Sequence, residues 1–246
     1  MPELPINPLF NNQKVYKKMG NVIKFDFKKP SPTGLVFNVD ARNPACYSGT
    51  GMQVFDTITR LEGTMVGDVS YDNETKAFDF YSSNNNVSKI VFNSNLLLQP
   101  EVATFVCVFK TGSSMLSRMD IFNEWVASYV CYFLFFMSGS DMYFYMNING
   151  NSLQYVLLPD FFITNTWYNV TCTYDGSVAR IYVNGVLKST ANISGILKNN
   201  GEPVQLGAGN SMENEGNFNG KIAIMQIYDR SFNSTEVENL YNQLNS

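Results

Sequence analysis

Histidine is absent from this chain of 246 residues. Without histidine there is no Ser-His-Asp or Cys-His catalytic arrangement, no histidine-ligated zinc, and no side chain that ordinarily titrates near neutral pH. Charged residues are also scarce, at 15% of the chain, and tryptophan occurs only twice. Carboxylate chemistry is therefore the main enzymatic option that this sequence leaves open.

Long apolar runs and a secretory signal are also missing. The most apolar run, residues 129–137, is too short to cross a bilayer and predicts a strand buried on both faces. The first eight residues, MPELPINP, lack a basic region followed by an apolar stretch, so we expect no secretion by a signal peptide. Cys107 and Cys131 lie inside apolar runs and are expected to be buried thiols in a reducing cytoplasm, because the spacings of the four cysteines fit no zinc pattern.

The residues that are present indicate one β-rich domain. Hydrophobic residues make up 45% of the chain, in short runs separated by Asn, Ser, Thr and Gly. Such turn residues at this spacing are typical of an all-β sandwich, and 246 residues suit a single one. No solenoid repeat or low-complexity linker divides residues 33–246.

The C-terminal part has the clearest local patterns. Ala179, Ile181 and Val183 share one face of an expected strand, and Asn184-Gly185 favours a type I′ turn, so residues 186–190 should pair back antiparallel. Asp175-Gly176 repeats this turn chemistry one strand earlier.

One helix is expected, near residues 234–244. Asn233 stands three residues before Glu236, which is a capping arrangement, and Val237, Leu240 and Leu244 follow at helical spacing. This is the only regular helix that the sequence predicts.

Several short motifs follow one another in a recognisable order. They are TWYNVTCTYDG (166–176), ARIYVNG (179–185), VQLG (204–207), FNGKI (218–222) and IYDR (227–230), preceded by GLVFNVDARNP (34–44), YSGTG (47–51), VFD (54–56) and AFD (77–79). This order resembles the laminin-G-like, concanavalin A-type jelly-roll family over residues 33–246. The opening motifs are similar to modules of virion and tail proteins of bacteriophages and large DNA viruses. The resemblance implies an antiparallel two-sheet jelly-roll with a short C-terminal helix.

The family includes glycosidases, which carry clustered acids on one strand, typically as Glu-x-Asp-x-Glu. The sequence has no such cluster. Glu213 and Glu215 come closest, but their Gly/Asn-rich surroundings predict an exposed loop. We therefore expect no catalytic residues and no enzymatic activity.

Binding sites are suggested by comparison with the family. Relatives hold Ca²⁺ at the sandwich rim, but here the first loop, which contains Asn85 and Asn86, has no carboxylate. Asn210 lies in the second loop, where only Glu213 and Glu215 could supply carboxylates, and both are displaced. We predict no metal and no cofactor, with calcium as the alternative. Trp125 matches no family position and could be an exposed sugar-stacking residue. These six residues are the candidate ligand-binding residues.

Alternation and turn placement also predict the core. The inward-facing residues are expected to be Phe105, Cys107, Val130, Phe133, Phe135, Trp167, Ile181, Val183, Ile222 and Ile224. Trp167 belongs to this set because it matches a structural tryptophan of the family at the start of a strand.

Residues 1–32 differ from the rest and are expected to form a basic, proline-containing arm. The first thirty residues hold six lysines, including Lys14, Lys17 and Lys18, against two acids, a net charge of +4 that leaves −8 on the remaining chain. One interpretation is an arm that docks on an acidic partner such as a capsid or tail subunit; the other is an ordinary added strand with solvated lysines. Nucleic-acid binding and membrane insertion are not expected.

Together these patterns predict a non-enzymatic structural, decoration or tail-associated protein of a virion, assembled in the host cytoplasm, with adhesion to a host-surface glycan as a possible added role. A carbohydrate-binding lectin module outside any virion is the alternative, followed by a divergent glycoside hydrolase.

Overall fold

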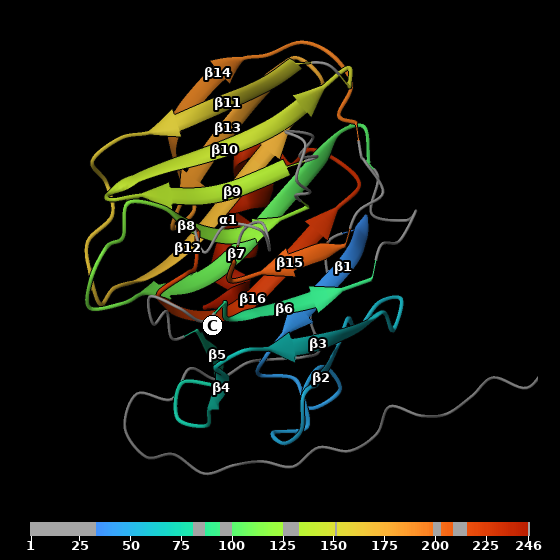
Figure 1. The fold of residues 1–246 in the computed structure, drawn as a ribbon. Helices are drawn as coiled ribbons and strands as arrows, with labels where there is room; N and C mark the ends of the chain where they lie inside the picture. Colours follow the sequence, from blue (N-terminus) through green and yellow to red (C-terminus); the bar gives the residue numbers. More distant parts are fainter. Residues whose placement is uncertain are drawn as a thin grey trace, which may run out of the picture.

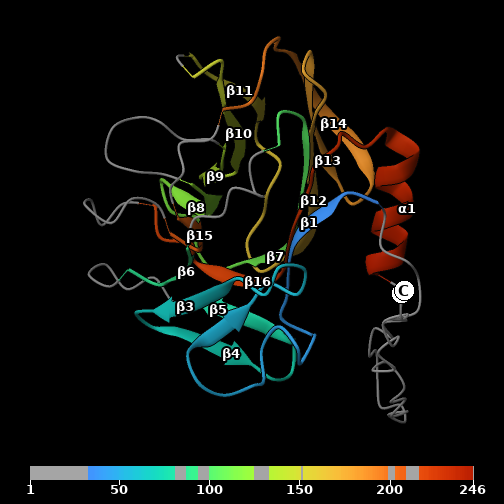
Figure 2. The same ribbon diagram turned by 90° about the vertical axis from the view of Figure 1, so that its right-hand side faces the viewer.

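The computed structural model describes residues 33–80, 87–93, 100–124, 133–150, 152–198, 203–208 and 216–245, and only the backbone of residues 133–137. Two eight-stranded antiparallel sheets, A and B, pack face to face, and one helix lies on the far side of sheet A (Figure 1; Figure 2). The predicted all-β jelly-roll sandwich is confirmed.

Sheet A has the strand order β14-β13-β12-β7-β16-β5-β4, and β1 pairs with β16 beside β5. Its strands are β1 (Leu35–Asp40), β4 (Val69–Asp72), β5 (Ala77–Phe80), β7 (Ala103–Thr111), β12 (Trp167–Tyr174), β13 (Val178–Val183), β14 (Val186–Asn192) and β16 (Gly220–Tyr228).

Sheet B has the order β11-β10-β9-β8-β15-β6-β3-β2. Its strands are β2 (Gln53–Phe55), β3 (Glu62–Val66), β6 (Lys89–Phe92), β8 (Met119–Asn123), β9 (Phe133–Ser138), β10 (Asp141–Ile148), β11 (Ser152–Leu158) and β15 (Val204–Leu206). At one end of the sandwich β11 approaches β14, where the Ser189 hydroxyl donates to the Leu157 carbonyl at 2.6 Å.

The main core lies between the sheets, because each strand turns alternate apolar side chains inward. On β10, for example, Met142, Phe144 and Met146 are buried in it. Of the predicted core residues, those described here and fully buried are Phe105, Cys107, Ile181, Val183, Ile222 and Ile224. Val130 and the side chains of Phe133 and Phe135 lie outside the described part of the chain, as does Cys131.

Two of the core predictions need correction. Trp167 is 36% exposed, because its neighbours Tyr168 and Val170 set the inward parity of β12 and leave Trp167 on the outer face of sheet A. Ile224 is buried but lies outside the main core, packing with Ala223. A bulge between Ile222 and Ile224 shifts the alternation of β16 at this point.

The helix α1 (Ser234–Leu244) begins and ends where the sequence predicts. The Asn233 side chain accepts from the Glu236 amide at 3.0 Å, and a Glu236 carboxylate oxygen accepts from the Asn233 amide at 2.9 Å, which forms the capping box. Val237 and Leu240 pack on the outer face of sheet A against Tyr182. Within the described ranges, no helix is long and apolar enough to cross a membrane.

The turns also agree with the sequence. Asn184 and Gly185 have φ values of 51° and 79°, as a type I′ turn requires, and join β13 to β14. In the turn before β13 only Gly176 has a positive φ, at 91°, while the Asp175 carboxylate accepts from the Val178 amide at 2.8 Å. The two Asx-Gly turns are therefore of different types.

The aspartates of the opening motifs serve the fold. Asp56 is fully buried and accepts hydrogen bonds from the Asn38 amide at 2.7 Å and the Thr59 amide at 2.6 Å, so it ties β1 to the turn after β2. Asp40 forms an ion pair with Arg42 at 2.7 Å. These motifs are thus explained by local structure. The expected arm, residues 1–32, lies outside the described residues.

Candidate functional site

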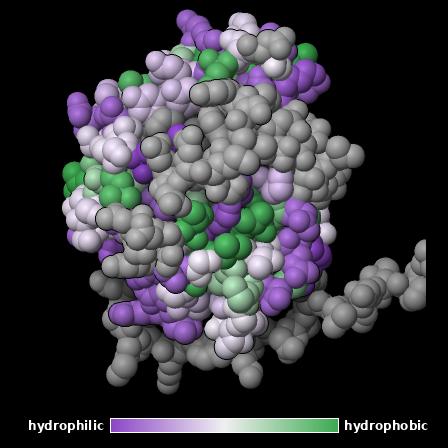
Figure 3. Space-filling model, in the orientation of Figure 1, coloured by the Kyte–Doolittle hydropathy of each residue, from purple (hydrophilic) through white to green (hydrophobic). Residues whose placement is uncertain are grey.

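All six predicted ligand-binding residues lie outside the described part of the chain: Asn85, Asn86, Trp125, Asn210, Glu213 and Glu215. The structure therefore neither brings them together nor separates them. The site described below lies on the outer face of sheet B, on the side of the molecule that Figure 3 shows.

The outer face of sheet B carries a continuous line of paired residues. Directly opposite residues of neighbouring strands project to the same face of a sheet. From β2 to β11 the register links Gln53, Thr64, Val91, Gln205, Asn123, Leu134, Tyr145 and Tyr155, which we call the cross-sheet row. Gln205 stands between the core residues Val204 and Leu206, so its side chain and the other described side chains of the row face away from the core; of residue 134 only the backbone is described.

One end of the cross-sheet row is aromatic. Tyr145 and Tyr155 are direct cross-strand partners with ring centroids 4.9 Å apart, and Tyr143 lies 5.9 Å from Tyr145 and 5.7 Å from Tyr155. Tyr155 is 48% exposed. We call these three residues the tyrosine cluster. The period-two pattern Tyr143-x-Tyr145, between the buried Met142, Phe144 and Met146, was a readable sequence signal for it.

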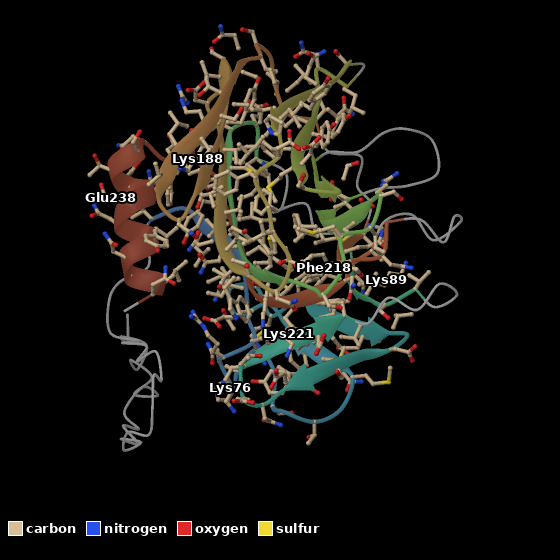
Figure 4. The ribbon with its side chains drawn as sticks, turned by 90° about the vertical axis from the view of Figure 1, so that its left-hand side faces the viewer. Lys76, Lys89, Lys188, Phe218, Lys221 and Glu238 are labelled. Carbon is tan, nitrogen blue, oxygen red and sulfur yellow. The ribbon has the colours of Figure 1, made fainter. Side chains whose placement is uncertain are left out.

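Further along the same face lies a half-buried lysine. Lys89 precedes the core residue Ile90 on β6, so its side chain leaves sheet B on the outer face, as Figure 4 shows. Its ammonium donates to the side-chain oxygen of the buried Gln205 at 2.9 Å. Desolvation by this burial lowers the pKa of Lys89, because the charged form loses hydration.

The middle of the face holds an ion pair at the start of β8. The Arg118 guanidinium donates to both oxygens of Asp120, at 3.0 and 3.1 Å, and Asp120 is fully buried. Burial raises the pKa of Asp120 to about 6, despite the opposing effect of Arg118. Asn123 is also fully buried and donates to the Ala208 carbonyl at 2.7 Å, while its own side-chain oxygen accepts no hydrogen bond from the described residues.

A separate open pocket of about 390 Å³ lies beside β2. It is lined by Pro44, Ala45, Cys46, Ser48, Thr50, Gln53, Phe55 and Arg60. The Arg60 guanidinium is already engaged, because it donates to the Ala45 carbonyl at 2.9 Å and lies 4.8 Å from the Phe55 ring centroid. Burial raises the pKa of the Cys46 thiol to about 12, which leaves no reactive thiolate here.

Metal binding finds no support in the described residues, which contain no group of three or more Cys, Asp or Glu side chains arranged to hold an ion. The residues considered for calcium lie outside the described ranges, so that alternative stays a prediction. Cys107 and Cys172 are buried free thiols, and burial raises the pKa of both.

Comparison with known proteins agrees with the fold. A laminin-G family model described as the concanavalin A-like lectin/glucanases superfamily matches residues 117–238. No curated protein matches the sequence.

Solved structures with similar folds include receptor-binding domains of botulinum neurotoxins. The binding domain of botulinum neurotoxin DC, solved in complex with rat synaptotagmin II, has a TM-score of 0.66 at 16% identity, and the match covers 86% of this chain and 52% of that chain. The same domain in complex with SialylT has a TM-score of 0.65 at 17% identity, and the match covers 86% of this chain and 52% of that chain. The botulinum neurotoxin serotype D binding domain has a TM-score of 0.65 at 17% identity, and the match covers 86% of this chain and 51% of that chain.

This chain therefore spans about half the length of those solved chains, and identities this low show a shared fold alone. The family match and the two-sheet architecture both indicate a concanavalin A-like jelly-roll. The resemblance found in the sequence is confirmed: the chain is similar to the laminin-G-like, concanavalin A-like lectin/glucanases superfamily and has its jelly-roll fold.

Proposed function

We propose that this protein is a non-enzymatic glycan-binding module and that the outer face of sheet B is its binding surface. The observation that carries this proposal is the tyrosine cluster at one end of the cross-sheet row. Aromatic rings offer flat apolar surface to the C–H faces of sugars, while their hydroxyls supply hydrogen bonds. Tyr155 is the most exposed of the three and presents both.

The similar structures support a binding role. Their titles describe binding domains, one in complex with rat synaptotagmin II and another with SialylT. A fold of this kind is thus compatible with both protein and sialyl ligands. The choice of a glycan for this chain rests on its own tyrosine cluster.

The outward side chains of β8 favour binding over hydrolysis. A glycosidase of this architecture needs two carboxylates on one strand face. Asp120 is the only carboxylate among residues Met119–Asn123, and Arg118 holds both of its oxygens. We expect Glu213→Gln combined with Glu215→Gln to leave the fold intact and to remove no hydrolytic activity. Turnover of a β-glucan panel that disappears in this double variant would overturn the non-enzymatic assignment.

A glycan array screened with the full chain tests the proposal. We expect the wild type to bind a defined subset of glycans, and Tyr155→Ala to weaken that binding roughly tenfold, because one aromatic stacking partner is worth about 1 kcal/mol or more. Trp167→Ala is the matched control, since it removes a partly exposed aromatic side chain from the opposite sheet. Equal binding by Tyr155→Ala and the wild type would refute the proposal.

Display on a virion, through docking of residues 1–32 on a capsid or tail subunit, is a second candidate function. It is supported by the opening motifs and by the charge contrast between the arm and the rest of the chain. Deleting about the first 20 residues should then leave a soluble sandwich that no longer joins the particle, and exchanging Lys14, Lys17 and Lys18 for Glu should weaken docking most at low salt. Undiminished co-sedimentation of both variants with the particle would contradict this role.

A further inference from the structure

The open pocket beside β2 lies at the opposite end of sheet B from β10 and β11, which carry the tyrosine cluster. Its volume of about 390 Å³ suits a small molecule or the last residue of a peptide. Of the residues that line it, Cys46 is buried, Phe55 is half-buried and the others are exposed. The pocket is therefore open to a ligand and separate from the proposed glycan-binding surface.

The cation of this pocket is held in one orientation. Arg60 has a φ of 63°, which is uncommon for a residue other than glycine, and its guanidinium lies 4.8 Å from the centroid of the Phe55 ring. One of its N–H groups donates to the Ala45 carbonyl at 2.9 Å. Because these contacts restrict the side chain before any ligand arrives, they lower the entropic cost of binding.

The charge of Arg60 is not neutralised within the described part of the chain. Arg60 takes part in none of the ion pairs found there. Asp56, four residues earlier, is fully buried and accepts from the amides of Ile58 and Thr59. A guanidinium has several N–H donors, and the Ala45 carbonyl uses only one of them. The others have no acceptor among the described residues.

Neutral polar groups complete the pocket. Ser48 and Thr50 supply hydroxyls, and Gln53 supplies a side-chain amide that lies beside Gly51. A side-chain amide both donates and accepts, so it can pair with a peptide group of a ligand. The planar fork of a guanidinium matches a carboxylate, with which it forms two parallel hydrogen bonds. The pocket thus combines a partner for a carboxylate with a partner for an amide.

We propose that this pocket binds an organic carboxylate that stands next to an amide, as in an N-acylated amino acid or at the C-terminus of a peptide. The carboxylate contacts the free N–H groups of Arg60, and the amide contacts Gln53. This binding activity goes beyond the proposed glycan-binding function, because it uses other residues at the other end of sheet B.

An NMR titration of the isotopically labelled full chain tests the inference with three probes: N-acetyl-alanine, its primary amide, and a pentapeptide that ends in alanine with a free carboxylate. We expect N-acetyl-alanine to shift backbone amides within residues 44–60 in a saturable manner. Its primary amide should bind roughly tenfold more weakly, because it forms no hydrogen bond between charged groups with Arg60. Tighter binding of the pentapeptide identifies a peptide C-terminus as the source of the carboxylate, and weaker binding identifies a free small molecule.

Three variants locate the effect. Arg60→Gln should weaken the binding of N-acetyl-alanine roughly tenfold. Gln53→Ala should weaken it less, because a neutral hydrogen bond contributes less than one between charged groups. Lys188→Gln is the matched control: it also removes a cation beside an aromatic ring, 5.5 Å from the Phe161 centroid, but on β14 of sheet A (Figure 4). Its affinity should equal that of the wild type.

Equal binding of N-acetyl-alanine and its primary amide, or unchanged affinity in Arg60→Gln, would overturn the inference. Thermal unfolding of Arg60→Gln checks that the fold is retained, since Arg60 also holds the Ala45 carbonyl. If this variant does not fold, unchanged affinity in Gln53→Ala has the same meaning, because the Gln53 side chain makes no hydrogen bond to the described residues.

Discussion

Asp120 shows how a single residue on the outer face of sheet B responds to its surroundings. It is fully buried, and although Arg118 stabilises its charged form, loss of hydration dominates and raises the pKa to about 6. The native state therefore holds this proton more tightly than the unfolded chain does. Unlike the hydrogen-bonded Asp175 and Glu236, whose pKa values are lowered, Asp120 favours folding most when it is protonated.

This predicts an unusual pH dependence of stability. As the pH rises from about 4 through about 6, the contribution of Asp120 to the free energy of unfolding should fall, because the unfolded chain releases the proton first. Urea unfolding of the wild type and of Asp120→Asn, from pH 4 to pH 7, measures the effect. The wild type should lose roughly 1 to 3 kcal/mol relative to the variant over this range. A constant difference between the two proteins would contradict the assignment.

Trp167 and Phe109 provide a contrast in packing. Phe109 is fully buried between the sheets, against Phe162, Tyr168 and Phe218, whereas Trp167 lies on the outer face of sheet A. We expect Phe109→Ala to lower the free energy of unfolding by about 3 to 5 kcal/mol and Trp167→Ala by about 1 kcal/mol or less. Chemical denaturation of both variants measures which substitution lowers the free energy of unfolding more. A larger loss for Trp167→Ala would mean that this residue is a core residue after all.

Residue-level prediction from the sequence succeeded where alternation was regular. Ala179, Ile181 and Val183 are all buried on one face of β13 as expected. The prediction that Trp167 lies in the core was wrong. It relied on a resemblance to a family position, whereas alternation along β12 turns Tyr168 inward and therefore Trp167 outward. The tyrosine cluster was not predicted, since pairing of Tyr145 with Tyr155 depends on a strand register that one sequence does not specify.

Among the elements, α1 is the one whose ends the sequence determines most clearly. Its capping box satisfies two backbone amides, and its apolar face covers Tyr182 and Tyr228 on sheet A. The ends of α1 could be predicted from the sequence because every capping contact joins residues no more than four positions apart. The order of strands in sheet B was not derivable in the same way, because β15 joins β6 to β8 from more than eighty residues away.

Removing the cap should destabilise the protein measurably. Asn233→Ala is expected to lower the free energy of unfolding by about 1 kcal/mol, because the Glu236 amide loses its acceptor at the start of the helix. Glu238→Ala serves as the control, since Glu238 is exposed on the same helix (Figure 4) and takes no part in the cap. Equal stability of the wild type and Asn233→Ala would show that the cap contributes nothing.

For the whole molecule, the two sheets have different outer faces. Sheet A is covered by α1 (Figure 2), which packs over Val106, Tyr182 and Tyr228. Sheet B bears the tyrosine cluster and Lys89 on its outer side. This asymmetry was only partly predictable: alternation and turns indicated the sandwich, and the resemblance indicated a binding fold. The face used for binding followed from strand order and register, which bring distant residues into one row.

The central claim is that glycans bind on the outer face of sheet B, at the β10–β11 end. The most direct measurement is an NMR titration of the isotopically labelled full chain with the tightest-binding array glycan, followed by mapping of the backbone amides that shift. The largest changes should fall within Asp141–Ile148 and Ser152–Leu158 and should disappear in Tyr155→Ala. Changes concentrated in β13, β14 and α1, or unaffected by Tyr155→Ala, would contradict the claim.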